Sequence, residues 1–458
     1  MEAALDPKKT DDKRVLALGL DLGTTSICGA VIDSWQNQMV EIFERPNNTN
    51  LISRYAYESL QDADALVSQA LDLIDLAISS YPDLQVISVT GQMHGILYIN
   101  AEGEAVSPLI TWQDKRGDLS YQDALSYCEY LTSKTKYPMA SGFGLVTHFY
   151  NLVHQQIPEN ASKIVTIMDY LTMRLAGQKT PVSHCSNAAS LGCFNLDTGS
   201  FDADSLRIVS IDPHWLPAVT DQNELIGCYR GIPVSVALGD NQASFLGAVS
   251  EPESSVLVNI GTGSQLSVMT NSPIRCGLEA RPYLQNKVLL AGSSLCGGRA
   301  YAVIERFFRE IAVSAGAPDR PLYPLLNQLA EKAYDRVNQT DPDAQLIVST
   351  QFCGTRANPS VLGSIQQISD QNLTPENMVY AALCGIAHEL FQFYQDAAPF
   401  LERKPRYLVA SGNAVRKNKV LQQVLAKTFG MTVVLPKFLE EASCGAALFG
   451  LACLSSED

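Results

Sequence analysis

The alternation of apolar and polar positions predicts a strand, a Gly-Thr turn and a second strand near the start of each half of the chain. In the first half, an apolar run from Val15 meets a Gly-Thr-Thr turn at residues 23–25, and residues 27–32 form another apolar run. In the second half, residues 256–269 read VLVNIGTGSQLSVM, so that glycines again separate two β-rich runs. Such runs bounded by glycine are typical of strands. We infer a duplicated domain, and coincidence is the alternative.

Alternating strand and helix patterns lie between these hairpins, which indicates α/β domains. Residues 59–80 carry apolar side chains at helical spacing, and residues 162–175 form a predicted helix that ends before Gly177. The strands predicted in the first half are residues 86–90, 96–99 and 234–238. In the second half, the predicted elements are helices at 298–312, 375–397, 417–429 and 443–453 and a strand at 431–435.

The length of 458 residues indicates two large domains, because one compact domain usually holds about 100–200 residues. We place the domain boundary near Gly247, just before the second hairpin. This division gives a flexible N-terminus at residues 1–14, a first domain at 15–247 and a second domain at 248–458. The last predicted helix is able to pack back across the boundary.

The composition is that of an ordinary globular protein. Hydrophobic residues make up 46% of the chain and charged residues 18%, which provides enough apolar surface for sizeable cores. The formal net charge of −15 argues against a broad nucleic-acid footprint and against an anionic membrane surface. The N-terminus is polar where a secretory signal is apolar, and no stretch approaches about 18 uninterrupted apolar residues.

The cysteines and histidines argue against structural metal sites and disulfides. Eleven cysteines are scattered singly without a Cys-x-x-Cys pair, and the six histidines include no His-x-x-x-His pair. This pattern is typical of reduced thiols in the cytoplasm and predicts neither a disulfide framework nor a zinc site. We expect a cytoplasmic protein that binds a small molecule, acts alone or as a homodimer, and contacts neither nucleic acid nor membrane.

The sequence contains neither a Gly-x-x-x-x-Gly-Lys-Ser/Thr loop nor a Gly-x-Gly-x-x-Gly loop after a strand, so a nucleotide must be bound in another way. The paired Gly-Thr turns can bind phosphate, because glycine allows close approach and successive N–H groups form an anion-binding concavity. Asp21 ends the strand before the first turn, where a magnesium ion that arrives with ATP would compensate its charge. Taken alone, each turn is equally an ordinary hairpin turn, and Asp21 a turn-capping residue.

Three polar loops follow apolar strands, at the edge where open α/β sheets bind ligands. Gly91–Gly95 offers amide and imidazole groups beside a methionine, and Trp112–Arg116 offers an aromatic face and a carboxylate, which together suit a polyol. Gly239–Gln242 contains Asp240, a carboxylate that can orient a hydroxyl and accept its proton during phosphoryl transfer. Each loop alone is also compatible with a simple turn.

Taken together, these motifs resemble the FGGY carbohydrate kinases over nearly the whole chain. DLGTTS at 21–26 and NIGTGSQ at 259–265 resemble the phosphate loops of that family, and GDNQ at 239–242 resembles its catalytic-base motif. GQMHG at 91–95 and the Trp-x-Asp-x-Arg pattern at 112–116 resemble its sugar-binding loops. Further similar segments are residues 352–359, 384–393 and 411–418.

The resemblance implies two ribonuclease-H-like, actin-type ATPase domains of the α/β class around a central cleft, with ATP and Mg²⁺ as cofactors. It assigns Asp240 as the catalytic base. The substrate-binding residues that it implies are Gln92, Met93, His94, Trp112, Asp114, Asp240 and Asn241. The residues implied for nucleotide binding are Gly23, Thr24, Thr25, Ser26, Gly261, Thr262, Gly412, Asn413 and Asn418, and those implied for magnesium, through water, are Asp21 and Asp240.

The substrate implied by the resemblance is a ketose that is phosphorylated on its terminal primary hydroxyl. GQMHG is similar to the xylulokinase and sedoheptulokinase branches of the family, and the segments at 239–242, 259–265, 296–298 and 411–418 are more similar to the second branch. We therefore expect sedoheptulose as the substrate, with D-xylulose as the alternative. Two departures from the family pattern lie at 142–148 and at Asn413 in the adenosine segment.

Two other functions share parts of this pattern. An actin-like or chaperone-like ATPase has the same pair of phosphate hairpins, but it has no need of polar sugar loops beside an aspartate. A catalytically silent sugar sensor keeps the fold, and the retention of Asp21, Asp240 and both Gly-Thr turns argues against it.

Overall fold

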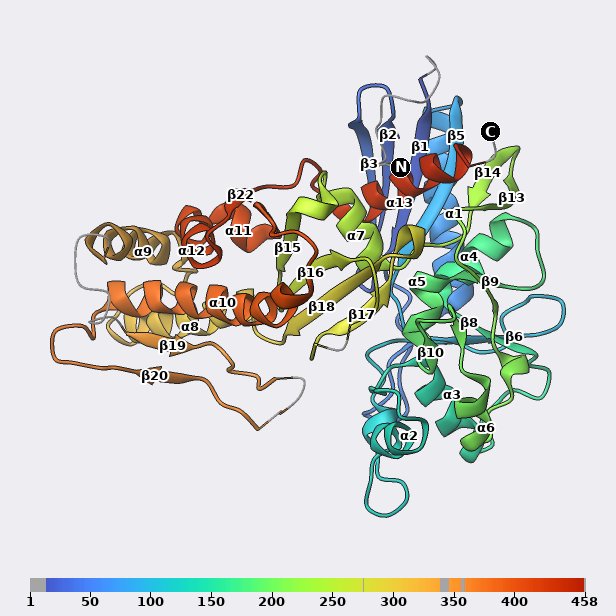
Figure 1. Cartoon of the computed structure of the whole chain (residues 1–458), viewed down its shortest axis with the longest axis horizontal. Helices are drawn as coiled ribbons and strands as arrows, with labels where there is room; N and C mark the ends of the chain where they lie inside the picture. Colours follow the sequence, from blue (N-terminus) through green and yellow to red (C-terminus); the bar gives the residue numbers. More distant parts are fainter. Residues whose placement is uncertain (1–13, 275, 338–345, 356–357, 359, 457–458) are drawn as a thin grey trace. The chain divides into compact units, whose positions relative to one another are not determined.

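The computed structural model describes residues 14–274, 276–337, 346–355, 358 and 360–456, and it shows strands and helices alternating along the chain (Figure 1). The chain forms two compact units, the first from residues 1–247, 281–287 and 438–458 and the second from residues 248–280 and 288–437. The first segment of the first unit thus ends at Gly247. The two later segments depart from the predicted continuous division, because they return to the first unit. Of the predicted flexible N-terminus, residues 1–14, only Arg14 lies within the described residues.

The first unit contains a six-stranded sheet among its described residues, in the order β13, β14, β5, β1, β2, β3. β1 (Leu16–Leu22) and β2 (Ser26–Asp33) form the predicted antiparallel hairpin, and β1 pairs in parallel with β5 (Leu84–Gly91). The other strands of this unit are β3 (Gln38–Pro46), β4 (Leu60–Gln61), β6 (Leu97–Ile99), β7 (Leu109–Ile110), β8 (Lys163–Val165), β9 (Val182–His184), β10 (Phe194–Asn195), β11 (Ser200–Phe201), β12 (Ala218–Thr220), β13 (Leu225–Tyr229) and β14 (Ile232–Ser235). Its helices are α1 (Ala63–Ser80), α2 (Tyr127–Thr135), α3 (Gly144–Val153), α4 (Ile167–Leu175), α5 (Cys185–Ala188), α6 (Ala203–Ile208), α7 (Asp240–Ala248) and α13 (Glu441–Leu454).

The two faces of β1 carry side chains of different size, because its sequence LALGLDL alternates leucine with smaller or polar residues. The leucines belong to a core formed with α1 and α4. The residues between the leucines, which include Gly19 and Asp21, lie on the opposite face of the strand, which α13 covers (Figure 1). A Cβ atom on Gly19 would lie 1.9 Å from the carbonyl oxygen of Ser443. The helix α13 therefore rests directly on the backbone of β1.

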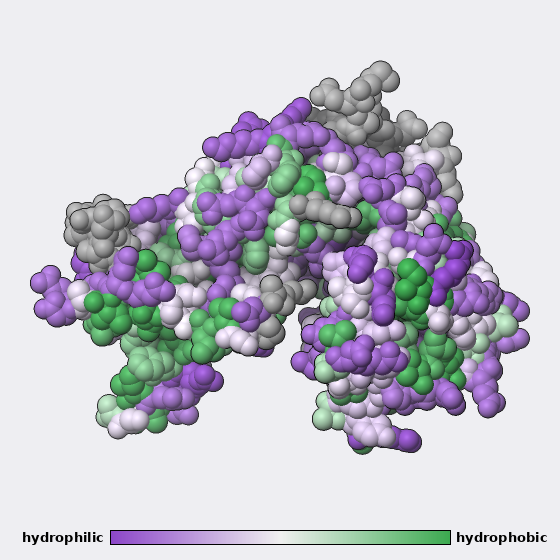
Figure 2. Space-filling view, turned by 60° about the horizontal axis from the view of Figure 1, so that its bottom comes forward, coloured by the Kyte–Doolittle hydropathy of each residue, from purple (hydrophilic) through white to green (hydrophobic). Residues whose placement is uncertain are grey.

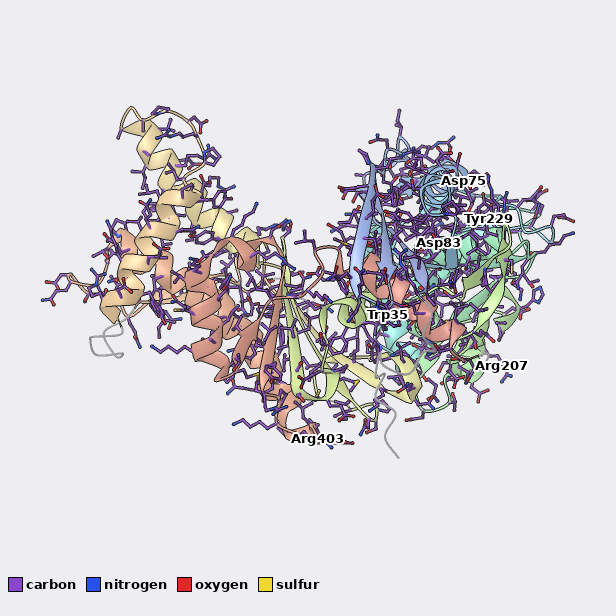
Figure 3. All side chains as sticks on the ribbon, turned by 90° about the horizontal axis from the view of Figure 1, so that it is seen from above. Trp35, Asp75, Asp83, Arg207, Tyr229 and Arg403 are labelled. Carbon is purple, nitrogen blue, oxygen red and sulfur yellow. The ribbon has the colours of Figure 1, made fainter. Side chains whose placement is uncertain are left out.

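The predicted helix at 59–80 is present as α1 but begins at Ala63. Asp62 caps it, since its carboxylate accepts the N–H of Ala65 at 3.0 Å, and the two residues before Asp62 form β4. At the far end of the sheet, Asp75 of α1 accepts hydrogen bonds from the hydroxyl of Tyr229 at 3.1 Å and from Nη2 of Arg230 at 2.6 Å (Figure 3). These bonds fix α1 to the edge hairpin of the sheet.

Two other predicted elements of the first half are divided differently in the structure. The predicted helix at 162–175 is split into β8 and α4, because Thr166 acts as an N-cap and accepts the N–H of Asp169 at 3.3 Å. The predicted strand at 234–238 ends at Ser235. The chain then leaves the sheet and enters α7 at Asp240, so the predicted catalytic carboxylate starts a helix.

The described part of the second unit contains a sheet in the order β17, β18, β16, β15, β21, β22. β15 (Ser255–Ile260) and β16 (Ser264–Thr270) form the second predicted hairpin, and β15 pairs in parallel with β21 (Tyr407–Ser411). The remaining strands are β17 (Glu279–Pro282), which ends in the first unit, β18 (Val288–Ser294), β19 (Ile347–Ser349), β20 (Ser364–Gln366) and β22 (Thr432–Val434). The helices are α8 (Gly298–Ser314), α9 (Tyr323–Val337), α10 (Pro375–Ala397), α11 (Asn413–Lys417) and α12 (Lys419–Phe429).

The two sheets repeat one arrangement. In each, the first hairpin strand pairs in parallel with a later strand that leads into a glycine, β1 with β5 and β15 with β21. A Cβ atom on Gly91 would lie 2.7 Å from the carbonyl oxygen of Leu22, and one on Gly412 would lie 2.5 Å from that of Ile260. The GQMHG loop and the SGNA segment therefore leave equivalent strands at equivalent points. The predicted fold class of two ribonuclease-H-like α/β domains is confirmed, and the central cleft between them stays a prediction.

The helix α13 also crosses α7 through glycine. A Cβ atom on Gly445 would lie 1.8 Å from the carbonyl oxygen of Ala243, and one on Gly247 would lie 2.0 Å from that of Glu441. We expect Gly445→Ala to lower the urea midpoint of unfolding, because forcing a methyl group into so close a contact costs about 1–3 kcal/mol or more. Urea titration followed by circular dichroism measures this shift.

Gly450→Ala is the matched control in the same helix. Its Cβ atom would lie 3.2 Å from its nearest neighbours, which are side-chain atoms of Val86 and Ser88. We expect this variant to shift the midpoint much less than Gly445→Ala does, because side chains can yield where a backbone carbonyl group cannot. Equal midpoints for the wild type and Gly445→Ala would contradict the close crossing of the two helices.

Candidate active site

The first Gly-Thr turn joins β1 to β2, and its carbonyl groups are bonded to the protein. The carbonyl oxygen of Gly23 accepts Nδ2 of Asn47 at 2.9 Å, and that of Thr25 accepts the backbone N–H of the same residue at 2.9 Å. Thr25 is exposed, and Ser26 after it is half-buried. A turn whose carbonyl oxygens are directed inward is suited to present N–H and hydroxyl groups to an anion.

Gln61 of β4 joins this turn to the predicted sugar loops. Its Nε2 donates to the carbonyl oxygen of Thr24 at 3.2 Å, and its Oε1 accepts Nε2 of Gln92 at 2.8 Å. Trp112 reaches the same turn, because its indole Nε1 donates to the hydroxyl of Thr24 at 3.0 Å. The structure thus brings together Thr24, Gln92 and Trp112, which the sequence predicts as parts of three separate motifs.

Gln92 carries an acceptor that the described residues leave unsatisfied. The residue is only 6% exposed, and its Oε1 has no hydrogen-bond partner in the described part of the chain. A buried polar atom without a partner costs about 1–3 kcal/mol. A hydroxyl group of a bound ligand is the kind of donor that this oxygen lacks, so Gln92 is suited to hold a polyol.

His94 is held in a fixed orientation. Its φ of +73° is uncommon for a residue other than glycine, and its ring stacks on Phe143 with the ring centroids 4.7 Å apart. Its Nδ1 lies 2.8 Å from the carbonyl oxygen of Ser190, which can only accept, so Nδ1 carries the proton. In the neutral ring Nε2 is then an acceptor, which suits the hydroxyl of a sugar.

The backbone that leads into Asp240 is fixed by a buried relay. The N–H of Gly239 donates to Oγ of Ser186 at 3.0 Å, and this hydroxyl lies 2.7 Å from Nδ1 of His184. The N–H of Ser186 also donates to that Nδ1 at 3.2 Å, so Nδ1 is an acceptor and the hydroxyl donates to it. Burial lowers the pKa of His184 to about 4, which keeps the ring neutral. The relay therefore holds one orientation at neutral pH.

Met93 packs beneath the same backbone. It is 4% exposed, and a Cβ atom on Gly239 would lie 3.1 Å from its Cε. Nearby, the hydroxyl of Thr90 donates to the carbonyl oxygen of Leu238 at 2.8 Å. The first sugar loop and the Asp240 loop are thus joined by packing and by hydrogen bonds, and the predicted contact of Met93 with a sugar stays a prediction.

Asp21, near the end of β1, is buried and is repelled by two other carboxylates. Burial, followed by repulsion from Asp240 and from Glu440, raises the pKa of Asp21 to about 7. Asp240 is the first residue of α7, and Glu440 directly precedes α13. Among the described residues, no group of three His, Cys, Asp or Glu side chains is arranged to hold a metal ion by itself. A cation brought by a ligand would relieve this repulsion.

Asp114 is hydrogen-bonded within its own loop and to Ser59. Its carboxylate accepts Nε and Nη2 of Arg116 at 2.8 and 3.1 Å, the backbone N–H of Arg116 at 3.0 Å and that of Ser59 at 3.1 Å. These four bonds match the about four acceptor positions of a carboxylate, and Asp114 is fully buried. Asp114 thus fixes the loop that carries Trp112, and its predicted contact with a sugar stays a prediction. Asn241 is 9% exposed and follows Asp240 in α7.

The second Gly-Thr turn is bonded to the start of α8. The N–H of Gly298 donates to the carbonyl oxygen of Gly261 at 2.7 Å, and that of Arg299 donates to the carbonyl oxygen of Thr262 at 3.0 Å. Gly261 and Thr262 are themselves exposed. A Cβ atom on Gly298 would lie 4.0 Å from Cβ of Ala414, so the predicted adenosine segment lies beside this turn within the second unit.

The two asparagines of the adenosine segment differ in their surroundings. Asn413 is exposed at the start of α11. Asn418 is buried, and it caps α12 by accepting the N–H of Leu421 at 3.0 Å while its Nδ2 donates to Oδ1 of Asn327 at 3.1 Å. Asn418 therefore fixes the start of α12, and its predicted contact with the nucleotide stays a prediction.

Comparison with known proteins identifies the family of this chain. The sequence profile of the N-terminal domain of the FGGY family of carbohydrate kinases matches residues 16–247, and that of the C-terminal domain matches residues 256–454. The chain belongs to the FGGY family of carbohydrate kinases. It is accordingly an ATP-dependent carbohydrate kinase.

Several relatives of this FGGY kinase are named for their activities. The sedoheptulokinases of Mus musculus and Homo sapiens are 27% and 26% identical to it, over 95% of this chain and 97% of each relative. The xylulose kinase of Streptomyces coelicolor is 26% identical, over 97% of this chain and 89% of the relative. The crystal structure of gluconate kinase from Lactobacillus acidophilus has the same fold, with a TM-score of 0.82 and 20% identity over 97% of this chain and 90% of that chain.

The surface of the FGGY kinase is mixed in character. In Figure 2 the visible face is a patchwork of hydrophilic and hydrophobic residues. No helix in the described part of the chain has both the length and the apolar character that crossing a membrane requires.

Sequence reasoning missed several residues that shape the site of the FGGY kinase. They are Gln61, Phe143, Ser186, Ser190 and Glu440. The run Ser-His-Cys-Ser-Asn at 183–187 was the available signal for the relay, since polar residues amid small apolar ones indicate a buried network. Gln61 and Glu440 are brought to the site by topology and carry no local signal.

We expect the Asp21 carboxyl of this kinase to titrate near pH 7 and its pKa to fall in Asp240→Asn, because that substitution removes a neighbouring negative charge. Carbon NMR of labelled aspartate carboxyl groups measures both values. The raised folded-state pKa means that Asp21 lowers stability as pH rises from its ordinary pKa of 3.8 toward 7, so Asp21→Asn should remove the contribution of Asp21 to this decline.

Asp169 provides an internal control for this titration. Burial raises its pKa to about 7 as well, but its partners are the hydroxyl of Thr166 at 3.0 Å and Nδ2 of Asn187 at 2.8 Å. We expect the Asp169 signal to stay in place in Asp240→Asn. A common shift of both signals, or none for Asp21, would contradict the coupling of Asp21 with Asp240.

Proposed function

We propose that this kinase transfers the γ-phosphoryl group of ATP to the terminal primary hydroxyl of sedoheptulose, giving sedoheptulose 7-phosphate. The observation that supports this substrate is the similarity to two sedoheptulokinases along almost the full length of both chains. The alternative substrate is D-xylulose, which the similarity to a xylulose kinase supports.

Asp240 is the base in this proposal. It accepts the proton of the attacking hydroxyl, and a positioned base of this kind contributes about 10²–10⁴-fold to the rate. The relay from His184 through Ser186 to Gly239 supports this role, because it fixes the backbone directly before Asp240. Phosphoryl transfer depends mainly on positioning and charge neutralisation, so a small displacement of this carboxylate would be costly.

The ketose is held by side chains of three loops. The unsatisfied amide oxygen of Gln92 accepts one hydroxyl and Nε2 of His94 accepts another, while Trp112 offers an aromatic face. Asn241 adds an amide next to the base, and Met93 lines the loop from below. Asp114 fixes the Trp112 loop and is also a proposed contact of the sugar.

Both Gly-Thr turns bind the phosphates of ATP in this proposal. The first contributes Gly23, Thr24, Thr25 and Ser26. The second contributes Gly261 and Thr262, at the start of α8, where the positive end of the helix dipole favours an anion. Gly412 and Asn413 receive the adenosine, in the segment that lies beside the second turn.

Magnesium fits the charges of the first unit. Burial and repulsion from Asp240 and Glu440 raise the pKa of Asp21, and a divalent cation bound through water to Asp21 and Asp240 would favour their ionised forms. When bound, Mg²⁺ neutralises charge on the transferring phosphates. We also propose a cytoplasmic protein, active alone or as a homodimer.

A panel of sugars tests the substrate. We expect ADP release with Mg-ATP to be fastest with sedoheptulose, compared by kcat/KM with D-xylulose, D-ribulose, L-ribulose, D-fructose, gluconate and glycerol, because the polyol loops resemble those of ketose kinases. A reaction without sugar is the control. Higher kcat/KM with D-xylulose would make this chain a xylulokinase, sugar-independent release would favour a simple ATPase, and silence with every sugar would favour a sensor.

The base is tested by Asp240→Asn. We expect kcat to fall about 10²–10⁴-fold while sedoheptulose still binds, since the amide keeps the shape of the side chain but cannot accept the proton. Coupled ADP release measures turnover, and calorimetry measures sugar binding.

Asp83→Asn is the control for that substitution. Asp83 is exposed directly before the first residue of β5, whereas the GQMHG loop begins at the last residue of that strand. We expect this variant to keep wild-type turnover. Unchanged turnover in Asp240→Asn would remove Asp240 from the role of base.

A further inference from the structure

Two cysteines of the second unit are in contact, although the sequence pattern predicts isolated thiols. Sγ of Cys296 and Sγ of Cys353 are 3.7 Å apart, while a disulfide bond needs about 2.05 Å. Cys296 lies between β18 and α8, and Cys353 lies in a turn after β19. Both are free thiols, so the two sulfur atoms are in contact without a covalent bond.

Arg299 makes the two thiols unequal. Its Nη1 lies 3.6 Å from Sγ of Cys353, and this hydrogen bond lowers the pKa of Cys353. Burial, together with the neighbouring Cys353, raises the pKa of Cys296 to about 11. Cys353 is half-buried whereas Cys296 is 1% exposed. The pair thus combines a reachable thiol that favours the thiolate with a buried thiol that stays protonated, which is the arrangement of a sensing and a resolving cysteine.

We propose that Cys353 and Cys296 form a peroxide-sensitive thiol pair that closes to a disulfide. The Cys353 thiolate attacks one oxygen of hydrogen peroxide, so that an S–O bond forms, the O–O bond breaks and hydroxide leaves to become water with a proton from solvent. The sulfur of Cys296 then attacks the sulfenic sulfur of Cys353. The S–S bond forms, the S–O bond breaks, and hydroxide leaves with the proton of Cys296 as water. The two sulfurs give up two electrons, and one peroxide becomes two waters.

The thiol pair is connected to the second Gly-Thr turn. Cys296 directly precedes Gly297, and a Cβ atom on Gly297 would lie 2.4 Å from the carbonyl oxygen of Gly263. Arg299, which contacts Cys353, also donates its backbone N–H to Thr262. Because Gly297 has no room to move toward the turn, drawing Cys296 to Cys353 displaces the backbone that supports Gly261 and Thr262. Oxidation therefore changes the affinity of this turn for phosphate.

The chemistry is tested on the full chain by mass spectrometry. Reduced protein is treated with hydrogen peroxide, and we expect the intact mass to drop by two hydrogens and peptides with Cys296 and Cys353 to be linked, with reversal by dithiothreitol. We expect Cys353→Ser to abolish the link and Cys296→Ser to stop at a sulfenic acid that reacts with dimedone. Cys228→Ser, at an exposed cysteine of the first unit, should form the link like the wild type.

Arg299→Ala tests whether the reaction depends on the thiolate form of Cys353 or only on the short distance between the two sulfur atoms. It leaves both cysteines in place and removes the cation beside Cys353, so we expect slower link formation that recovers as pH is raised. Oxidation of Cys353 without a link to Cys296 would overturn the proposal. A link that forms at the wild-type rate without prior oxidation of Cys353 would also overturn it.

The effect on nucleotide binding rests on the proposed function of the second turn. We expect the disulfide form to show a KM for ATP raised about fivefold or more, with the KM for the sugar little changed. Cys353→Ser treated with peroxide should keep the KM of the reduced enzyme. A linked protein with an unchanged KM for ATP would overturn the connection to the turn. Because mass spectrometry detects the link without any turnover, failure of the proposed kinase substrate would leave this test of the thiol pair intact.

Discussion

Backbone-to-backbone packing of α13 is the constraint on which the candidate site depends. Glycines at 19, 247 and 445 leave no space for a methyl group where α13 meets β1 and α7. This close packing brings the ends of three elements together, and each end carries a carboxylate, Asp21, Asp240 or Glu440. The burial of Asp21 and its repulsion by the other two carboxylates together raise its pKa, and both follow from the close packing. Larger residues at the glycine positions would therefore lower this pKa.

The duplicated sheets have diverged in charge. Asp21 pairs with Thr90 across the parallel strands of the first sheet, and Asn259 pairs with Ser411 at the equivalent point of the second. The second copy thus has a neutral amide where the first has a carboxylate. A phosphate meets no negative side chain at this position of the second copy, where the N-terminus of α8 supplies a favourable dipole. In our proposal, one copy provides proton and metal chemistry, and the other provides anion binding.

Much of the fold was predictable because its strongest elements have local causes. The hairpin at 16–33 is encoded by apolar runs around a Gly-Thr turn, and the helix at 375–397 begins at Thr374-Pro375 as capping rules predict. Short elements were missed where one cap decides, as at Thr166. The contacts of Ser186 with Gly239 and of Cys296 with Cys353 join distant segments, so they depend on topology that a single sequence does not reveal.

The response of the site to pH follows from the neighbours of its titratable groups. His184 accepts two hydrogen bonds at Nδ1, and protonation there would break both, which agrees with its pKa of about 4. The relay behind Asp240 thus stays neutral over the range in which Asp21 changes its charge. Titration of Asp21 therefore changes the charge beside Asp240 near pH 7 without disturbing the relay. A bound cation would lower the pKa of Asp21 and move that change to lower pH.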